Sequence, residues 1–194
     1  RQMYQLLSVF HQATENEMDR GLAWYCEAHF QAMEIAVHHH LPTDLICGVT
    51  AAISPRVPWK RTFPAVERIV TAFEQGQSLP SGTYCPRNGD KAYSMLRDGS
   101  VSSWLNGPKV EAFYDNLSFP QYSTRVTVDM HAISAFFGRK MDSREVRYVM
   151  RTRDRMRSVE RSYQDAAEYV GIMPNQFQAI VWLTWRRLVG AKFQ

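Results

Sequence analysis

The apolar residues of this chain recur at helical spacing along almost its whole length, and this pattern constrains the fold more than any other feature. Between Met3 and His39 they follow a period of three to four residues, and the run QAIVWLTW (178–185) is apolar enough for a buried helix. Strand-like alternation is confined to a few residues near 125–128, which is too short for a sheet. The sequence therefore predicts an all-α fold.

The breaks between apolar stretches predict where the helices begin and end. We expect helices over 3–39 (one helix, or two with a break at 14–17 and the second over 22–40), 45–54, 63–74, 91–96 (capped by 88–90) and 143–169, and a final helix that starts after Pro174-Asn175. The run SPRVPWKR (54–61) should be a fixed loop, because Pro55 and Pro58 disfavour helical geometry in the residues before them.

Composition indicates a globular protein with one domain over residues 1–194. Hydrophobic residues make up 45% and charged residues 22%, and a chain of 194 residues can enclose a single core. No apolar stretch approaches the ~20 residues that a membrane span needs. The three cysteines, Cys26, Cys47 and Cys85, form no CxxC pair, so a zinc knuckle, an iron-sulfur cluster and a disulfide framework are not expected. We expect a cytoplasmic protein without a cofactor.

Basic residues are concentrated in one segment. The net charge is only +4, but nine of the 23 Lys and Arg residues lie between Arg139 and Arg161, where four acids offset them. Helical spacing would place Arg144, Arg147, Arg151 and Arg155 near one face. This segment is typical either of a surface for a polyanionic partner or of an ordinary solvated helix.

The run His38-His39-His40 has two interpretations. Imidazoles are common metal ligands, but adjacent residues of a helix point about 100° apart and cannot all reach one ion. We therefore expect a frayed helix end before Pro42 and no metal site.

The run SPRVPWKR also combines cations with an aromatic residue. Arg56, Lys60 and Arg61 surround Trp59, a mixture that suits a phosphate backbone and a stacked base. Alternatively, Trp59 packs on the core and the cations lie in solvent.

The segment 104–138 contains the residues best suited to chemistry. Gly107-Pro108 leads into a helix whose first amide groups, together with Lys109, could bind an anion. Asp129 stands at the entry of the next helix after a short extended run. The simpler alternatives are a surface lysine for Lys109 and a helix N-cap for Asp129.

The order of these segments resembles the helix-hairpin-helix DNA glycosylases of the endonuclease III type. In that family a hairpin L-P-G-V-G-x-K precedes V-D-T-H-V by about twenty residues; this sequence has LNGPKV (105–110) and then VDMHA (128–132). Ile53-Ser54 is similar to the family's L-L-S, and NGDKA (88–92) to its N-x-x-K-A. The chain looks most similar to small bacteriophage proteins of this kind with SPRxxW, GPKVxxFxxN and VTVD segments.

The resemblance implies a helix-hairpin-helix glycosylase-like fold, double-stranded DNA as partner, host cytoplasm if the protein is phage-encoded, and action on a base flipped from the duplex. Asp129 would assist cleavage of the N-glycosidic bond, and Lys109 would attack the sugar or contact phosphate. The residues implied in DNA binding are Ser54, Arg56, Trp59, Lys60, Arg61, Gly107, His131 and Arg139.

Two alternatives to base removal are open. A phage enzyme of this scaffold could join an amine or amino acid to an activated hydroxymethyl-thymine, with Asp129 deprotonating the amine. The chain could also be a non-catalytic DNA-binding module, because its hairpin has one glycine and Pro108 lacks an N–H for phosphate. The oligomeric state is left open.

Overall fold

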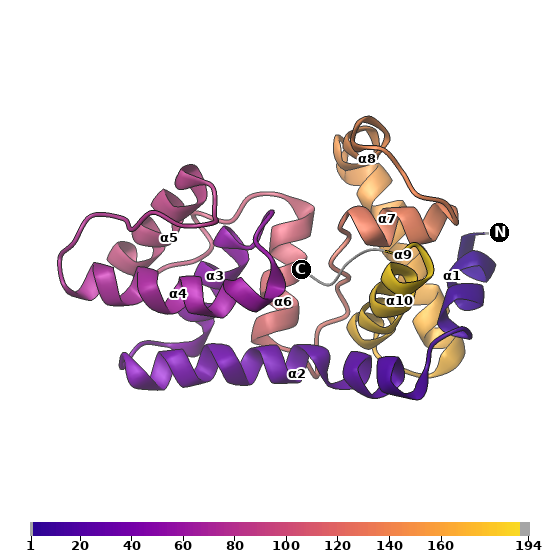
Figure 1. Ribbon diagram of the computed structural model, residues 1–194, viewed down its shortest axis with the longest axis horizontal. Coiled ribbons are helices and arrows are strands. Elements are labelled where there is room, and N and C mark those ends of the chain that lie inside the picture. Colours follow the sequence, from indigo (N-terminus) through magenta and orange to yellow (C-terminus); the bar gives the residue numbers. More distant parts are fainter. Residues whose placement is uncertain (1, 191–194) are drawn as a thin grey trace. The chain divides into compact units, whose positions relative to one another are not determined.

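The computed structural model describes residues 2–190 (Figure 1), and these residues form α-helices joined by turns, without a strand. The all-α prediction is confirmed. The helices are α1 (Gln2–Phe10), α2 (Glu15–His38), α3 (Thr43–Ile53), α4 (Trp59–Glu74), α5 (Pro86–Asp98), α6 (Pro108–Ser118), α7 (Met130–Phe137), α8 (Ser143–Met150), α9 (Arg153–Val170) and α10 (Pro174–Leu188). Within the described residues no helix is both long and apolar enough to cross a membrane.

The chain divides into two compact units. The first unit contains the described residues 2–26 and 119–190, and the second contains Glu27–Ser118. Helix α2 contributes its first half to the first unit and its second half to the second. This division does not test whether residues 1–194 form one domain, so that statement stays a prediction.

Helix α3 is the centre of the second unit. Every residue from Leu45 to Ile53 is buried, and α3 packs against α4, α5 and α6 (Figure 1). Gly48 permits a close approach, because a Cβ atom there would lie 2.5 Å from a side-chain carbon of Val101. A helix this apolar on all sides can only be stable inside such a bundle.

Helix α10 has the same position in the first unit, where it packs against α1, α7 and α9. The rings of Phe10 and Phe177 stack in this core with centroids 5.0 Å apart. Tyr163 of α9 is fully buried, and its hydroxyl donates a hydrogen bond to the carbonyl of Ala132, 2.9 Å away. This bond fixes the first turn of α7, which begins directly after Asp129.

A carboxylate closes the turn between α1 and α2. Glu17 accepts hydrogen bonds from the Thr14 N–H at 2.9 Å and from Arg187 Nε of α10 at 2.7 Å. Burial raises the pKa of Glu17, but the hydrogen bonds from Arg187 and Thr14 outweigh burial and hold this pKa below its usual value. Because Thr14 and Glu17 cap each other, α2 begins at Glu15, and the expected start of a second helix at residue 22 is wrong.

Three other expected boundaries are also wrong. The helix expected over 143–169 is two helices, because Thr152 breaks the run and caps α9 by accepting from the Arg155 N–H. The arginines of this segment are therefore divided between two helices. The expected loop 54–61 ends at Pro58, since Trp59 already begins α4. Helix α5 begins at Pro86, a residue with a fixed φ, and not after 88–90.

Candidate functional site

Asp129 holds its carboxylate between two fixed donors at the start of α7. Its backbone is extended, and Oδ1 accepts a hydrogen bond from the Ala132 N–H at 2.8 Å, which makes Asp129 the N-cap of α7. The other oxygen, Oδ2, accepts from the indole N–H of Trp182 in α10 at 3.0 Å. The capping interpretation is therefore correct as geometry, but the second bond goes beyond what a cap needs.

Aromatic side chains surround this carboxylate. The ring of His131 meets the ring of Trp182 edge to face, with centroids 6.1 Å apart, and the centroid of the Trp24 ring lies 5.4 Å from that of Trp182. Asp129, His131, Trp24 and Trp182 are all half-buried. The arrangement combines a negatively charged acceptor with flat apolar surfaces, and all of its residues belong to the first unit.

A buried cation accompanies Asp129. The guanidinium carbon of Arg186 lies 4.5 Å from the centroid of the Trp182 ring, and Arg186 is only 7% exposed. Burial lowers the pKa of Arg186, while the negative charge of Asp129 acts in the opposite direction. Burial and the same negative charge raise the pKa of Tyr163 well above its usual value, so its hydroxyl stays a neutral donor.

The hairpin residues lie in the second unit. Gly107 has a φ of +117°, which a glycine adopts readily, and its N–H donates to the carboxylate of Glu111 at 3.1 Å. A side-chain carboxylate thus already lies at the start of α6, where an anion was expected to bind. Lys109, in the first turn of α6, is half-buried. Asp129 and the side chains described around it belong to the first unit, and the hairpin residues belong to the second.

The other residues expected to bind DNA lie near the start of α4. Ser54 is the C-cap directly after α3, and its hydroxyl donates a hydrogen bond to the carbonyl of Ala51. Arg56 is exposed and has a positive φ of 66°. The ring of Trp59 meets Phe63 and Phe113 edge to face at 5.6 and 6.3 Å, which favours the packing interpretation of this tryptophan. Lys60 and Arg61 follow it in the first turn of α4, and both are exposed.

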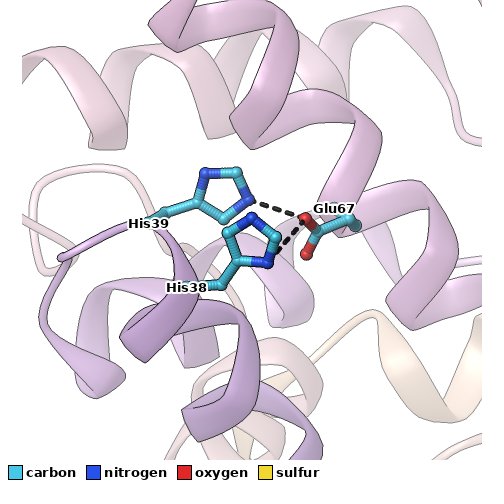
Figure 2. Close-up of side chains that lie close together, drawn as sticks. All are labelled: His38, His39 and Glu67. Atoms are coloured by element: carbon cyan, nitrogen blue, oxygen red, sulfur yellow. Dashed lines mark hydrogen bonds and ion pairs between the residues drawn. The ribbon is translucent and has the colours of Figure 1, made fainter.

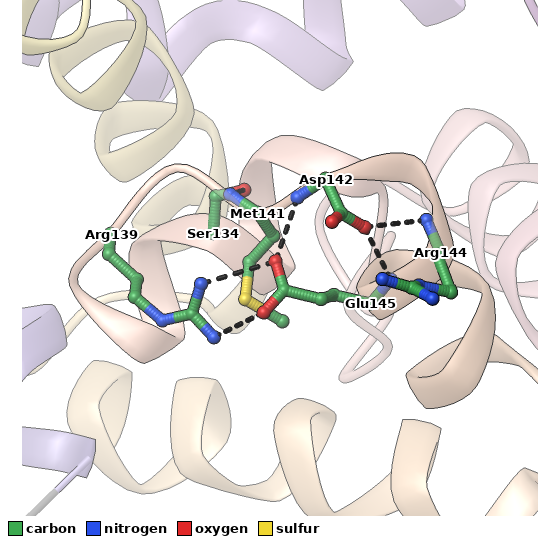
Figure 3. Close-up of polar contacts among 6 residues, drawn as sticks. All are labelled: Ser134, Arg139, Met141, Asp142, Arg144 and Glu145. Atoms are coloured by element: carbon green, nitrogen blue, oxygen red, sulfur yellow. Dashed lines mark hydrogen bonds and ion pairs between the residues drawn. The ribbon is translucent and has the colours of Figure 1, made fainter.

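Arg139 is paired with an acid (Figure 3). Its guanidinium donates to both oxygens of Glu145, at 3.1 and 2.5 Å. Glu145 also accepts from the Asp142 N–H, and Asp142 accepts from the Glu145 N–H, so the two acids form a capping box at the start of α8. The hydrogen bonds from Arg139 and from the Asp142 backbone lower the pKa of Glu145 to about 2.

A pocket of about 620 Å³ lies between the end of α7, α8 and the start of α9. Apolar side chains, including Phe136 and Val159, form much of its lining, together with Arg139, Arg144 and Arg155. The Arg155 guanidinium carbon lies 3.7 Å from the centroid of the Tyr148 ring. Because an eight-residue helix is about 12 Å long, this pocket at the far end of α7 is separate from the surroundings of Asp129.

The sequence interpretation missed several residues of these sites. Trp24, Trp182 and Arg186 contact the region of Asp129 from distant parts of the chain, and no sequence spacing joins them to it. Tyr148 and the pocket could have been suspected from the arginine-rich segment, which the sequence analysis treated as charge alone.

The histidine run differs from its expected form. Helix α2 ends at His38, but His39 is not frayed, because its side chain is only 5% exposed. Its two ring nitrogens lie 2.6 Å from Glu74 Oε2 and 2.7 Å from Glu67 Oε1 (Figure 2 shows the second contact). Burial lowers the pKa of His39, but the hydrogen bonds to Glu74 and Glu67 outweigh it, so the pKa is raised overall.

Comparison with known proteins places the chain in a family without giving it an activity. Residues 1–188 match the family described as "Family of unknown function (DUF7178)", and the chain belongs to that family. No curated protein and no solved structure matches it.

Proposed function

We propose that this protein is a DNA-binding enzyme with a helix-hairpin-helix glycosylase-like fold that acts on a base flipped from the duplex, with Asp129 as its catalytic carboxylate. The observation that carries the proposal is the position of Asp129. Its two oxygens are oriented by the Ala132 N–H and the Trp182 indole, beside flat side chains.

The chemistry of base removal needs such a carboxylate. Breaking the N-glycosidic bond develops positive charge on the sugar, and a negative group held in place stabilises that charge without reorganising. The carboxylate can also accept a proton from an attacking nucleophile. The rings of Trp182, Trp24 and His131 lie at angles to one another and are half-buried, and aromatic rings of this kind are what a flipped base stacks on.

Exposed cations support DNA as the partner. Arg144, Arg147, Arg151 and Arg157 in the segment 139–161 are exposed, as are Lys60 and Arg61 at the start of α4. Such residues bind phosphates without reading sequence, and their contribution falls as salt concentration rises.

A second candidate is transfer of an amine or amino acid to an activated hydroxymethyl-thymine in phage DNA. The carboxylate of Asp129 favours it, because Oδ2 is held by the Trp182 indole N–H and can act on an amine that a co-substrate brings. Asp129 would accept the proton that this amine loses. The alternative of a non-catalytic DNA-binding module is supported by the hydrogen bond from the Ala132 N–H to Asp129, because this capping bond alone gives Asp129 a structural role.

The test compares two aspartates that cap helices. Asp129→Asn should retain DNA binding and abolish the base change, measured by mass spectrometry of nucleosides after incubation with modified phage DNA. The matched control is Asp142→Asn, which alters the N-cap of α8 and should leave the base change intact. Loss of a base indicates a glycosylase, and a heavier base formed only with an added amine indicates the transferase.

If the unaltered protein leaves the DNA and all of its bases unchanged, the interpretation as a non-catalytic DNA-binding module is correct. A covalent complex trapped by borohydride in the unaltered protein and absent in Lys109→Ala would assign Lys109 as the nucleophile.

A further inference from the structure

Two imidazoles and a carboxylate converge where the end of α2 meets α4 in the second unit (Figure 2). His38, His39 and Glu67 each offer one ligand atom, and these atoms lie within 4.8 Å of one another. Oε1 of Glu67 is 2.7 Å from His39 Nε2 and 4.0 Å from His38 Nδ1. The two rings are stacked, with centroids 4.7 Å apart and an interplanar angle of 15°.

The end of α2 explains how adjacent histidines share one site. His40 has a φ of +53°, and the N–H of Leu41 donates back to the carbonyl of Ala36, which closes the helix. Because the helix ends at His38, the side chain of His39 is not bound to the 100° step of a continuing helix. On α4, Glu67 and Glu74 are seven residues apart, about two turns, and therefore share the face that receives His39.

The two carboxylates that face the ring nitrogens of His39 require a positive charge between His39 and one of them. A neutral imidazole has one N–H and one lone pair, whereas ionised carboxylates only accept. If Nδ1–H donates to Glu74, the lone pair of Nε2 faces an oxygen of Glu67 only 2.7 Å away. A proton or a metal ion between these atoms removes the repulsion. A metal ion would in addition bind the nitrogen of His38, which lies 4.0 Å from the same Glu67 oxygen, as a third ligand.

We propose that His38, His39 and Glu67 bind a divalent transition-metal ion of the Zn²⁺ class, and that Glu74 orients His39 for this purpose. Two imidazole nitrogens and one carboxylate form a common ligand set for such ions, and solvent completes the coordination. Tetrahedral sites with bonds of about 2.0–2.1 Å have ligand atoms about 3.3 Å apart. The distances from Glu67 Oε1 to His39 Nε2 and to His38 Nδ1, 2.7 and 4.0 Å, lie on either side of that value.

The surroundings suit this class of ion. Glu74 accepts from the ring nitrogen of His39 that does not face Glu67, as carboxylates do behind metal-bound histidines. The His38 side chain is 73% exposed, so an ion can enter from solvent and keep bound water. A bound ion would link the end of α2 to the middle of α4 and stabilise the second unit.

The experiment is zinc titration of the full chain, prepared without a polyhistidine tag and freed of metal with a chelator. Isothermal calorimetry with ZnCl₂ should show a single site per chain. Glu74→Gln should weaken binding about 10-fold or more through the orientation of His39, and His39→Ala or Glu67→Gln should weaken it at least about 100-fold. The matched control is His40→Asn, which changes the neighbouring imidazole to a residue that tolerates a positive φ and should bind zinc normally.

His38→Ala separates a loss of zinc binding from a loss of folding, because this exposed side chain can be removed without opening the core. It should weaken zinc binding while circular dichroism stays unchanged. The proposal is overturned if the unaltered protein binds no zinc, or if His38→Ala and His39→Ala bind it as well as His40→Asn does. It is also overturned if ¹⁵N NMR in excess zinc shows both ring nitrogens of His39 still protonated.

Discussion

Asp129 shows how one side chain can have two tasks because its oxygens are used separately. Oδ1 satisfies an N–H that the first turn of α7 would otherwise leave unpaired, and Oδ2 is directed by Trp182. A cap alone contributes about 1 kcal/mol. The indole bond adds orientation, since it fixes the second oxygen relative to the rings of His131 and Trp24.

Trp182→Phe tests the importance of the indole bond. The substitution keeps an aromatic ring but removes the donor to Asp129, so we expect the free energy of unfolding to fall by about 1–2 kcal/mol. Under the proposed function, turnover should fall further than stability explains. The measurements are urea denaturation and the nucleoside assay.

The control for this substitution is Trp104→Phe. Trp104 Nε1 also donates to a carboxylate, that of Asp98, at 2.9 Å, but this bond is exposed. In Trp104→Phe the free energy of unfolding should fall by less than about 0.5 kcal/mol, because water replaces the lost donor at an exposed carboxylate. Equal losses at both positions would contradict the special role given to the Asp129 bond.

At the scale of elements, the start of α8 is stabilised by the capping box of Asp142 and Glu145 and by Arg139, which pairs with Glu145. Glu145 has a pKa of about 2 against a usual value of 4.5, so its ionised form is the one that the folded chain stabilises. A lowered pKa means that the stabilisation is complete above about pH 4.5 and is lost as the pH falls towards 2.

We therefore expect α8 to loosen in acid before the core does. Two-dimensional NMR should show the amide signals of Asp142 and Arg144 shifting between pH 4.5 and pH 2, in step with the Glu145 carboxyl. In Arg139→Gln the same transition should move to higher pH, because the guanidinium that lowers the pKa is gone. A Glu145 carboxyl that titrates near 4.5 in the unaltered protein would contradict this prediction.

Helix positions were largely predictable from the sequence because local signals determine them. The apolar period located α3 and α10, and Gly138 ends α7 in the left-handed conformation that favours glycine. The division of α8 from α9 was missed, because charge spacing suggested one continuous helix and the cap by Thr152 competes with it. Local helix propensity did not predict the break between α8 and α9, which lies where the Thr152 side chain accepts a hydrogen bond from the Arg155 N–H.

The sites were less predictable, because they depend on contacts between distant residues. The position at a helix entry indicated Asp129, and the family resemblance indicated His131. Trp182, which donates to Asp129, lies 53 residues further along the chain than Asp129. The step of about 100° between adjacent residues separates the histidine side chains only where a helix continues through 38–40. The helix ends at His38, and the partners Glu67 and Glu74 come from α4, which the histidine run itself does not indicate.

At the scale of the whole molecule, each unit has its own central helix. The second unit is a continuous stretch of chain, Glu27–Ser118, and the side chains around α3 come from within it. We expect a fragment of residues 27–118 to fold alone, with a helical circular dichroism spectrum and cooperative thermal unfolding. A size of roughly 90 residues is sufficient for an independent core.

The control fragment carries Gly48→Leu. A Cβ atom at this position already meets Val101 at 2.5 Å, so the larger side chain should prevent α3 from packing. If both fragments unfold without cooperativity, the second unit needs the rest of the chain, and the one-domain interpretation becomes the better description.

The first unit is discontinuous in sequence, and this imposes an order on synthesis. Helix α1 leaves the ribosome early, but its partners α7, α9 and α10 are translated only after the whole second unit. Until then the apolar side chains of α1, such as Leu6 and Phe10, lack the core that buries them. A nascent chain paused after residue 118 would thus hold a folded second unit behind an exposed apolar N-terminal segment, which is a natural binding site for a chaperone.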